Sequence, residues 1–249
     1  MNVLICGIGG RMGREVARLA QSGYRNSVPV AGFDIAVPEA SDIPVYSDWN
    51  DIKESIDVII DFSHHAGTEA LLKFATEKKI PTVVATTGHT EAEAALIRQS
   101  AEIIPIFHAA NMSLGVALLI ELAKITAKTF PDADIEIIEK HHNRKLDAPS
   151  GTALAIANAL KTVREKASFV FGRQGNAKRT ENEIGIHAIR MGNIVGEHEV
   201  IVGTDTQTIS LKHEAHSRSL FAEGAIAAAE FIADKPAGFY DMNRMIAAD

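Results

Sequence analysis

A cluster of basic side chains lies directly ahead of a helix start near the middle of the chain. Two histidines, an arginine and a lysine fall within five residues: His141, His142, Arg144 and Lys145. Residues 149–152 then lead into an apolar stretch that predicts a helix, with Ser150 or Thr152 as its N-cap. The first N–H groups of a helix have no intrahelical partner and attract anions, and imidazoles exchange protons near neutral pH. The pattern predicts a site that holds carboxylates and moves a proton.

A metal centre and a plain charged surface are the alternatives for this cluster. Adjacent residues of a strand point to opposite faces, so His141 and His142 cannot both bind one ion in regular geometry. The chain has a single cysteine, Cys6, and no H-E-x-x-H motif, so nothing completes a zinc site. A solvated charged face does not require a helix start to follow it. We therefore expect no metal and favour an anion site.

For most of the other histidines we expect loop or structural roles. We expect His64 and His65, which follow a predicted strand, to be loop residues near a cofactor. Structural roles are expected for the isolated histidines of the second half, His187, His198, His213 and His216. His187 and Arg190 form one further candidate pair, on the expectation that they share a strand face and line a site.

A second candidate site is a glycine-rich turn between the first predicted strand and the first predicted helix. It comprises Gly7, Ile8, Gly9, Gly10, Arg11, Met12 and Gly13, spaced as G-x-x-G-x-x-G. Glycines there let the backbone approach a pyrophosphate closely, at the N–H groups of a helix start. Asp34 ends the second predicted strand, 21 residues after Gly13, where a carboxylate accepts hydrogen bonds from an adenosine ribose. The pattern predicts a nicotinamide dinucleotide site; a tight turn without a nucleotide is the alternative.

The residues around Asp34 bear on the choice between NADH and NADPH. A carboxylate repels a 2′-phosphate, and Ile35 rather than an arginine follows Asp34. These residues favour NADH. NADPH stays open, because Arg11 and Arg14 could reach a 2′-phosphate.

Both candidate sites need elements to position them, and the first hundred residues alternate strand-like and helix-like stretches. Short apolar runs suited to buried strands occupy residues 3–6, 28–33, 58–60, 82–84 and 103–107. Repeated units of this kind predict an α/β domain with a doubly wound parallel sheet. Residues 86–88 and 109–112 follow the fourth and fifth strands, at the sheet edge where ligands bind.

The pattern changes after residue 111. Helices are predicted at residues 114–128 and 152–163, strands at 135–141, 184–190, 195–202 and 208–213, and a final helix at about 217–232. Consecutive strands without intervening helices predict an antiparallel or mixed sheet. Two domains of different architecture therefore fit the chain better than one.

Composition excludes several classes of protein. The 249 residues carry a net charge of −7, so nucleic acid is not the expected partner. Because 46% of the residues are hydrophobic, we expect a sizeable core. No apolar run reaches the roughly 18 residues of a membrane span, and no signal peptide precedes the first strand. We expect a soluble cytoplasmic protein without a membrane partner. Residues 140–190 hold 10 basic and 4 acidic side chains, a local excess that points to an anionic substrate.

These motifs together resemble the dihydrodipicolinate reductase family, also called 4-hydroxy-tetrahydrodipicolinate reductases, of lysine and diaminopimelate synthesis. Residues 139–153 match the family's E-x-H-H-x-x-K-x-D-A-P-S-G-T-A signature, and residues 7–13 match its G-x-x-G-R-M-G turn. Further matches are residues 61–63, 86–88, 111–116, 184–190 and 195–198. Two positions depart from the pattern: Ala85 and Met191 stand where glycine is common, and Met191 puts the local turn geometry in doubt.

The resemblance implies a Rossmann-like cofactor domain, residues 1–112 and 217–249, and a domain for substrate binding and tetramerisation, residues 113–216, in a homotetramer. It implies NAD(P)H-dependent reduction of 4-hydroxy-tetrahydrodipicolinate, a small cyclic dicarboxylate, to tetrahydrodipicolinate. His141 and Lys145 would handle the proton. His142, Gly151 and Thr152 would bind substrate carboxylates. The cofactor would be held by Gly7, Ile8, Gly9, Gly10, Arg11, Met12, Asp34, Ala85, Thr86, Thr87, Ala109, Ala110, Asn111 and Met112.

Two other functions stay open at this point. One is a nicotinamide reductase that acts on a different small dicarboxylate. The other is a non-catalytic protein that senses NAD(H), although a sensor has no need for the segment that contains His141, His142 and Lys145.

Overall fold

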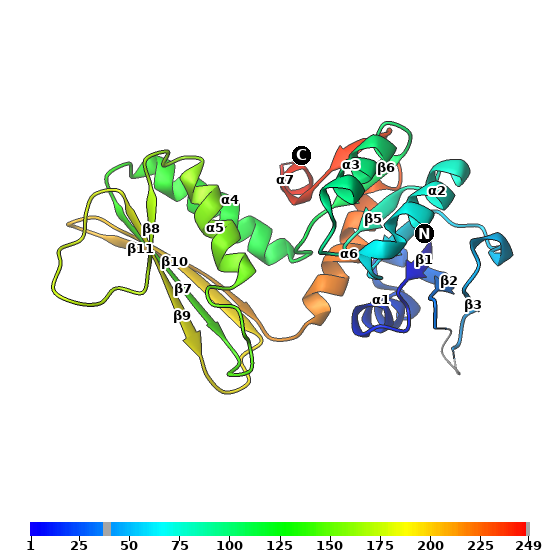
Figure 1. Cartoon of the computed structure of the whole chain (residues 1–249), viewed down its shortest axis with the longest axis horizontal. Coiled ribbons are helices and arrows are strands. Elements are labelled where there is room, and N and C mark those ends of the chain that lie inside the picture. The colour runs from blue at the N-terminus through cyan, green and yellow to red at the C-terminus, as the bar shows by residue number, and fades with distance from the viewer. Residues whose placement is uncertain (37–40, 248–249) are drawn as a thin grey trace. The chain divides into compact units, whose positions relative to one another are not determined.

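The structure, a computed structural model, describes residues 1–36 and 41–247 (Figure 1). The chain divides into two compact units. Unit 1 comprises residues 1–113 and 219–249, and unit 2 comprises residues 114–218. The C-terminal segment of the chain thus belongs to the same unit as the N-terminal segment.

Unit 1 is built on a seven-stranded sheet in which every neighbouring pair of strands is parallel. Its strands are β1 (Asn2–Cys6), β2 (Val28–Phe33), β3 (Val45–Tyr46), β4 (Val58–Asp61), β5 (Thr82–Val84), β6 (Pro105–His108) and β12 (Gly238–Tyr240). The order β3-β2-β1-β4-β5-β6-β12 contains the strand order of dinucleotide-binding folds. The predicted doubly wound parallel sheet is confirmed.

Two pairs of packed helices and a short C-terminal helix accompany this sheet in unit 1. They are α1 (Arg11–Gln21), α2 (Thr68–Lys78), α3 (Glu91–Ser100), α6 (Ser219–Ile232) and α7 (Met242–Ile246), with 3-10 turns η1 (Tyr24–Asn26), η2 (Trp49–Asp51) and η3 (His65–Gly67). Helix α1 packs against α6, and α2 packs against α3. Leu4, Ile59 and Ile106 belong to the core between the sheet and the second pair.

The topology fixes where a ligand can approach unit 1. The chain runs from β1 to β2 on one side, and β4 pairs with the other side of β1, with Cys6 opposite Asp61. The loops after β1 and β4 therefore diverge at this point. In open α/β sheets, ligands bind in the crevice that such a divergence creates.

Unit 2 contains a five-stranded mixed sheet and two helices. The strands are β7 (Asp134–His141), β8 (Ser168–Phe171), β9 (Glu183–Arg190), β10 (Gly196–Gly203) and β11 (Thr208–Ala215), in the order β11-β10-β7-β9-β8. Strand β10 is antiparallel to β7 and β11, whereas β9 is parallel to β7 and β8. The helices are α4 (Leu114–Thr129) and α5 (Gly151–Lys161). The predicted mixed sheet is confirmed.

Strict alternation separates the two faces of this sheet. In β7, Ile135 and Ile137 are buried in the core with residues of α4 and α5, among them Leu119 and Ile156. Continuing at period two, the same face carries Glu139 and His141 at the end of the strand. We call this the inner face. On the inner face, polar side chains thus follow directly after the apolar core of unit 2.

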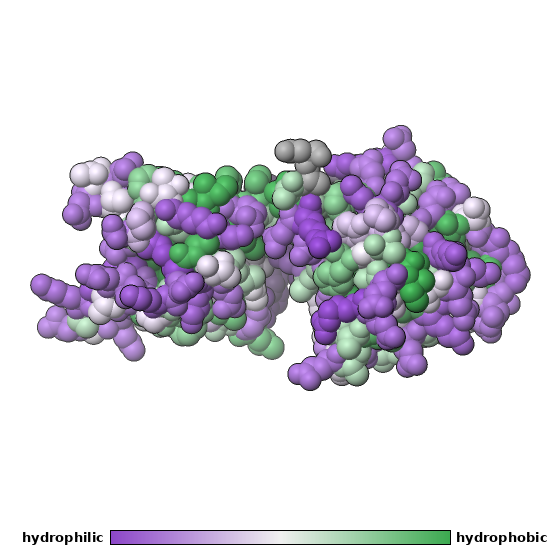
Figure 2. Space-filling model, turned by 90° about the horizontal axis from the view of Figure 1, so that it is seen from above, coloured by the Kyte–Doolittle hydropathy of each residue, from purple (hydrophilic) through white to green (hydrophobic). Residues whose placement is uncertain are grey.

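Hydrophilic residues dominate the view in Figure 2, and apolar residues appear there as small separate patches. Among the described residues, three exposed apolar side chains, Leu118, Leu122 and Ile125, follow one another along α4. No described helix is both long and apolar enough to cross a membrane.

We predict that Gly13→Ala destabilises the protein. A Cβ at Gly13 would lie 2.1 Å from the carbonyl oxygen of Gly7, and this backbone atom cannot move aside without a large energetic cost. We expect a loss of about 1–3 kcal/mol, as for overpacked cores, although alanine is the better helix former. Urea unfolding measures the change, with Gly67→Ala as control because a Cβ there would be 3.9 Å from Ser63 Oγ. An unchanged or raised stability of Gly13→Ala would refute the close approach.

Candidate active site

The glycine turn of unit 1 forms an open helix start. Gly7 has a left-handed φ of 75°, and its carbonyl accepts a hydrogen bond from the N–H of Gly10 (2.9 Å). Gly10 is the N-cap of α1, but no side chain caps the helix and its first turn contains no acid. The first N–H groups of α1 can therefore bind an anion. This geometry fits the pyrophosphate of a dinucleotide.

The structure brings Asp34 to the glycine turn. Its Oδ2 accepts from the N–H of Gly9 (2.9 Å) and its Oδ1 from the N–H of Ala36 (3.1 Å). A Cβ at Gly9 would lie 3.0 Å from Oδ2, so glycine permits this approach. A carboxylate beside an anion-binding helix start suits a ribose hydroxyl next to a phosphate.

Asp61 is a supporting residue to which the sequence analysis gave no role. Its buried carboxylate, at the end of β4, accepts from the N–H (3.0 Å) and Oγ (2.5 Å) of Ser63 and from Thr86 Oγ1 (2.7 Å). Burial raises the pKa of Asp61, and these hydrogen bonds oppose the rise. Asp61 thereby ties the loop after β4 to the loop after β5. The motif at residues 61–63 was the available signal.

The remaining cofactor candidates lie on neighbouring strand ends in unit 1. The N–H of Ala85 donates to the carbonyl of Asp61 (3.0 Å), and Thr87 is exposed next to Thr86. Residues 109–112 follow β6, which pairs with β5. All the predicted cofactor residues except Asp34 therefore follow β1, β5 or β6 at one edge of the sheet, and Asp34 follows β2 at that same edge.

The histidine pair at residues 64–65 has structural partners. His64 Nδ1 accepts from the N–H of Ala66 (3.2 Å), and His65 Nδ1 lies 3.0 Å from Glu93 Oε1. The hydrogen bond with His65 lowers the pKa of Glu93 to about 2. Glu93 also completes the capping box of α3 with Thr90.

In unit 2, the candidate site is organised around Glu139, whose side chain is completely buried. Its carboxylate meets His141 Nδ1 (2.6 Å), the N–H of Ser150 (2.9 Å) and two Arg190 nitrogens (2.7 and 2.8 Å). Burial opposes ionisation of Glu139, but the hydrogen bonds from His141, Arg190 and Ser150 lower its pKa to about 2. Glu139 has no role predicted from the sequence, although its spacing from His141 places both on one strand face.

His141 is held between this carboxylate and β10. A Cβ at Gly196 would lie 3.1 Å from His141 Nε2, so the absence of a side chain at Gly196 leaves room for that atom. The ring of His198 lies 5.2 Å from the ring of His141. His198 Nε2 is 3.0 Å from Ser150 Oγ, which accepts from the N–H of Ala153 as the N-cap of α5. Burial and the neighbouring His141 lower the pKa of His198 to about 4.

Lys145 and the start of α5 stabilise a carboxylate. Lys145 Nζ lies 2.8 Å from Asp147 Oδ1. Lys145, and to a smaller extent the backbone N–H of Gly151, lower the pKa of Asp147. A Cβ at Gly151 would meet nothing within 4 Å, so the helix start is open on that side. Ser150, rather than Thr152, is the N-cap.

His142 lies beside this segment with an unsatisfied ring nitrogen. Its backbone N–H donates to the carbonyl of Ile194 (2.8 Å), and its buried Nδ1 has no hydrogen-bond partner in the described structure. Burial, followed by the charge of Arg144, lowers the pKa of His142. The N–H of Met191 donates to the carbonyl of His141 (2.9 Å), so the pairing of β7 and β9 continues through Met191, and the chain turns after it at Gly192, which has a left-handed φ of 52°.

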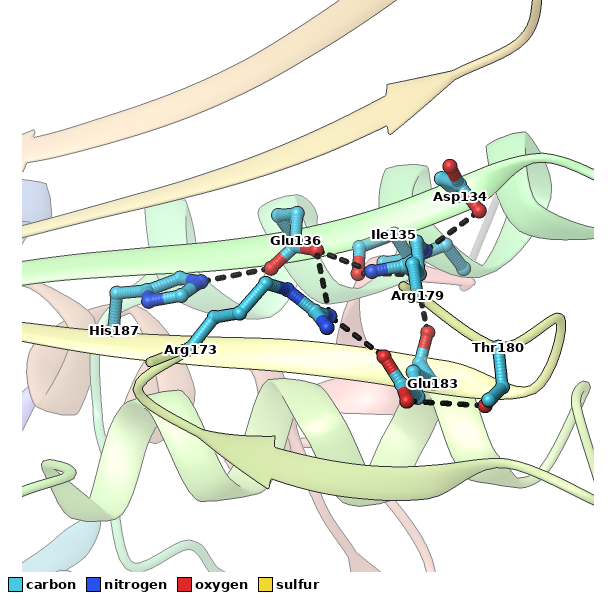
Figure 3. Close-up of polar contacts among 8 residues, drawn as sticks. All are labelled: Asp134, Ile135, Glu136, Arg173, Arg179, Thr180, Glu183 and His187. Atoms are coloured by element: carbon cyan, nitrogen blue, oxygen red, sulfur yellow. Dashed lines mark hydrogen bonds and ion pairs between the residues drawn. The ribbon is translucent and has the colours of Figure 1, made fainter. Parts of the chain in front are cut away.

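A second Glu–His–Arg cluster lies on the other face of the unit 2 sheet (Figure 3). Glu136 Oε2 is 2.8 Å from His187 Nε2, and Glu136 Oε1 pairs with Arg179 and Arg173. Arg173 also binds Glu183 (2.6 Å). Some of the excess basic side chains of residues 140–190 therefore form ion pairs away from His141.

The expectation that His187 and Arg190 share a strand face is wrong. They are three residues apart, an odd number, so they point to opposite faces. His187 binds Glu136 on the outer face and Arg190 binds Glu139 on the inner face. Among the described residues, no group of three or more His, Cys, Asp or Glu side chains is placed to hold a metal ion.

Comparisons with known proteins identify the family. Residues 1–112 match the model "Dihydrodipicolinate reductase, N-terminus", and residues 115–246 match "Dihydrodipicolinate reductase, C-terminus". Proteins named 4-hydroxy-tetrahydrodipicolinate reductase from Caldanaerobacter subterraneus and Clostridium tetani are 47% and 43% identical, covering 99% of this chain and 98% and 97% of theirs. The chain therefore belongs to the dihydrodipicolinate reductase family.

The fold is similar to that of a solved structure. It is described as a dipicolinate-bound dihydrodipicolinate reductase from Paenisporosarcina sp. TG-14. It is 24% identical, has a TM-score of 0.83, and the match covers 99% of each chain.

We predict that acid destabilises the protein through His198. Its folded pKa of about 4 lies below the ordinary value of 6.5, so the unfolded chain binds more protons between these pH values. The free energy of unfolding should fall by about 3 kcal/mol on this account as pH falls through that window. Urea unfolding of His198→Gln should show a stability deficit that shrinks by this amount from pH 7 to 4. The exposed His216→Gln is the control, and parallel curves for His198→Gln and wild type would contradict the prediction.

Proposed function

We propose that this member of the dihydrodipicolinate reductase family catalyses NAD(P)H-dependent reduction of 4-hydroxy-tetrahydrodipicolinate to tetrahydrodipicolinate, in lysine and diaminopimelate synthesis. The observation that carries the proposal is the juxtaposition, within unit 2, of a carboxylate-stabilising segment and a buried, oriented histidine. Lys145 and the start of α5 stabilise the Asp147 carboxylate, and His141 lies at the end of the strand that precedes them. A protein that only senses NAD(H) needs neither.

The chemistry requires a hydride and a proton. When bound, the nicotinamide supplies a hydride to C4 of the conjugated C=C–C=N system that remains once the substrate has lost water from its 4-hydroxyl group. A proton is then added to the adjacent ring carbon, which balances the reduction. The residues of this chain must therefore hold two carboxylates, stabilise charge on the ring nitrogen and provide the proton.

The proposed cofactor residues are those at the carboxyl edge of the unit 1 sheet. The N–H groups at the start of α1 would bind the pyrophosphate, and Asp34 would accept hydrogen bonds from the adenosine ribose. The loops at residues 85–87 and 109–112 would line the nicotinamide end. Asp61 supports this role by holding Thr86.

The proposed substrate residues belong to unit 2. Gly151 and Thr152 would present N–H groups of α5 to a carboxylate of the substrate. The N–H of Gly151 now stabilises the carboxylate of Asp147 at this position. His142 would offer its unpartnered ring nitrogen. Lys145 would donate the proton, and His141 would donate, accept or orient it. Substrate would have to displace Lys145 from Asp147.

Assembly and location are also part of the proposal. The family resemblance supports a homotetramer formed by unit 2, in the cytoplasm. Light scattering on the purified chain tests the tetramer, and a monomeric mass at micromolar concentration would count against it.

We predict that Lys145→Met and His141→Gln lose mainly kcat. Proton transfer by a positioned side chain contributes about 10²- to 10⁴-fold in rate, so we expect kcat to fall by that factor. NADH affinity, measured by fluorescence, should stay within about threefold because those residues lie in the other unit from the glycine turn.

The assay follows absorbance at 340 nm with enzymatically generated substrate. Lys140→Met is the matched control, because Lys140 neighbours His141 but pairs with Glu197 (3.0 Å). Near-normal kcat in either test variant would remove that residue from the proposed role. Absence of consumption by the wild-type protein, with either NADH or NADPH, would reject the proposed function.

We predict a preference for NADH that Asp34 creates. Its carboxylate would lie near a 2′-phosphate and repel it. We expect Asp34→Ala to lower the ratio of kcat/KM for NADH to that for NADPH by about tenfold, equivalent to about 1.4 kcal/mol. Asp57→Ala is the control, because Asp57 binds the N–H of Asn2 (2.6 Å), at the opposite ends of the strands. A wild-type preference for NADPH would contradict the proposal.

A further inference from the structure

We propose that Glu139 is a positioning residue for His141: its carboxylate fixes a proton on Nδ1 and leaves Nε2 as the atom that exchanges a proton during the reaction. The inference deepens the proposed function and rests on the role of His141 in it. It concerns a side chain that the sequence analysis left without a role.

The surroundings of Glu139 set its ionisation state. The carboxylate is completely buried, and a buried charge is tolerated only when it is paired and hydrogen-bonded. Arg190 binds it through two nitrogens, at 2.7 and 2.8 Å, and the N–H of Ser150 donates at 2.9 Å. Glu139 is therefore ionised and can only accept hydrogen bonds.

The ionised carboxylate of Glu139 fixes the position of the imidazole proton. His141 Nδ1 lies 2.6 Å from Glu139 Oε2, and two acceptors cannot share a hydrogen bond without a proton between them. Because the carboxylate is the acceptor, Nδ1 carries the hydrogen. Nε2 is then the ring nitrogen left to exchange a proton during the reaction.

The other ring nitrogen of His141, Nε2, lies beside β10. That atom faces the backbone of β10 at Gly196, where even a methyl group would lie only 3.1 Å away. Glycine at this position leaves room beside Nε2. Glu139 thus holds Nδ1, and the absence of a side chain at Gly196 avoids a contact of 3.1 Å with Nε2.

Arg190 connects the surroundings of His141 with those of Lys145. Arg190 Nη2 donates to the carbonyl of Asp147 (2.6 Å) as well as to Glu139. Asp147 is the partner of Lys145. The Glu139–Arg190 pair therefore fixes both the imidazole and the loop that carries the lysine, so a disturbance at Glu139 reaches both proposed proton-handling groups.

The outer face of the same strand supplies a matched control. Glu136 binds His187 and two arginines, as Figure 3 shows, so the residue types repeat those around Glu139. The difference lies in burial: the side chain of Glu136 is 28% exposed and that of Glu139 is 0% exposed. Glu136→Gln removes the same charge from the same strand without touching His141.

The test compares Glu139→Gln, Glu139→Asp and Glu136→Gln. We expect Glu139→Gln to lower kcat by about 100-fold, within the range for a displaced proton-transfer group, while KM and NADH affinity change by less than about threefold. The acidic limb of the pH profile of kcat should also move. Glu136→Gln should retain wild-type kcat and an unchanged profile.

Glu139→Gln leaves the Arg190 guanidinium without its charge partner and could fail to fold. Glu139→Asp keeps that charge but draws the carboxylate back by one methylene from His141. We expect Glu139→Asp to retain a Tm near wild type and still to lose kcat. A Glu139→Asp protein with wild-type kcat and pH profile would overturn the inference.

A spectroscopic arm separates this inference from the proposed function. Long-range ¹H–¹⁵N spectra of the imidazoles, assigned with His141→Gln, report which ring nitrogen carries the hydrogen without any turnover. We expect the Nδ1–H form for His141 in the wild type and its loss in Glu139→Gln. An Nε2–H form in the wild type would overturn the inference, even if the enzyme is active. Locked Nδ1–H without NAD(P)H consumption would sustain the positioning but reject the proposed reaction.

Discussion

The pairing of the buried Glu139 carboxylate is the constraint on which the rest of the candidate site depends. A charge without solvent must be compensated, and the compensating donors come from three separate segments: β7 itself, the start of α5 and the end of β9. Because all of them converge on one carboxylate, the histidine, the anion-binding helix start and the lysine loop are held as one piece.

The two units attract anions by the same local means rather than by net charge. Each presents a helix start after a strand–turn segment, open in α1 and capped by Ser150 in α5. Neither first turn contains an acid. A chain with a net charge of −7 can therefore bind anionic ligands. The basic excess of residues 140–190 indicates the anion site less directly, because Arg173 and Arg179 form ion pairs on the opposite face of the sheet from Glu139.

Much of the fold could be predicted because buried parallel strands are short continuous apolar runs. Strands β1, β2, β4 and β5 are of this kind, and the helix start at α5 carries its own capping residue. Strands β3, β8 and β12 escaped prediction because they are short and lie at sheet edges, where only one neighbour defines them. Strand β6 begins two residues later than predicted, since Ile103 is exposed and precedes the ladder.

The sequence by itself determined which chemistry is present: glycines for a close approach, histidines and a lysine for protons, and a helix start for an anion. Only the tertiary structure decided which groups act on one another. Glu139 and Arg190 are 51 residues apart and meet because β7 and β9 pair in register. His187 and Arg190, three apart, are separated by the sheet. The physical reason is that side-chain direction follows local periodicity, whereas partnership follows strand order and register, which depend on the whole core.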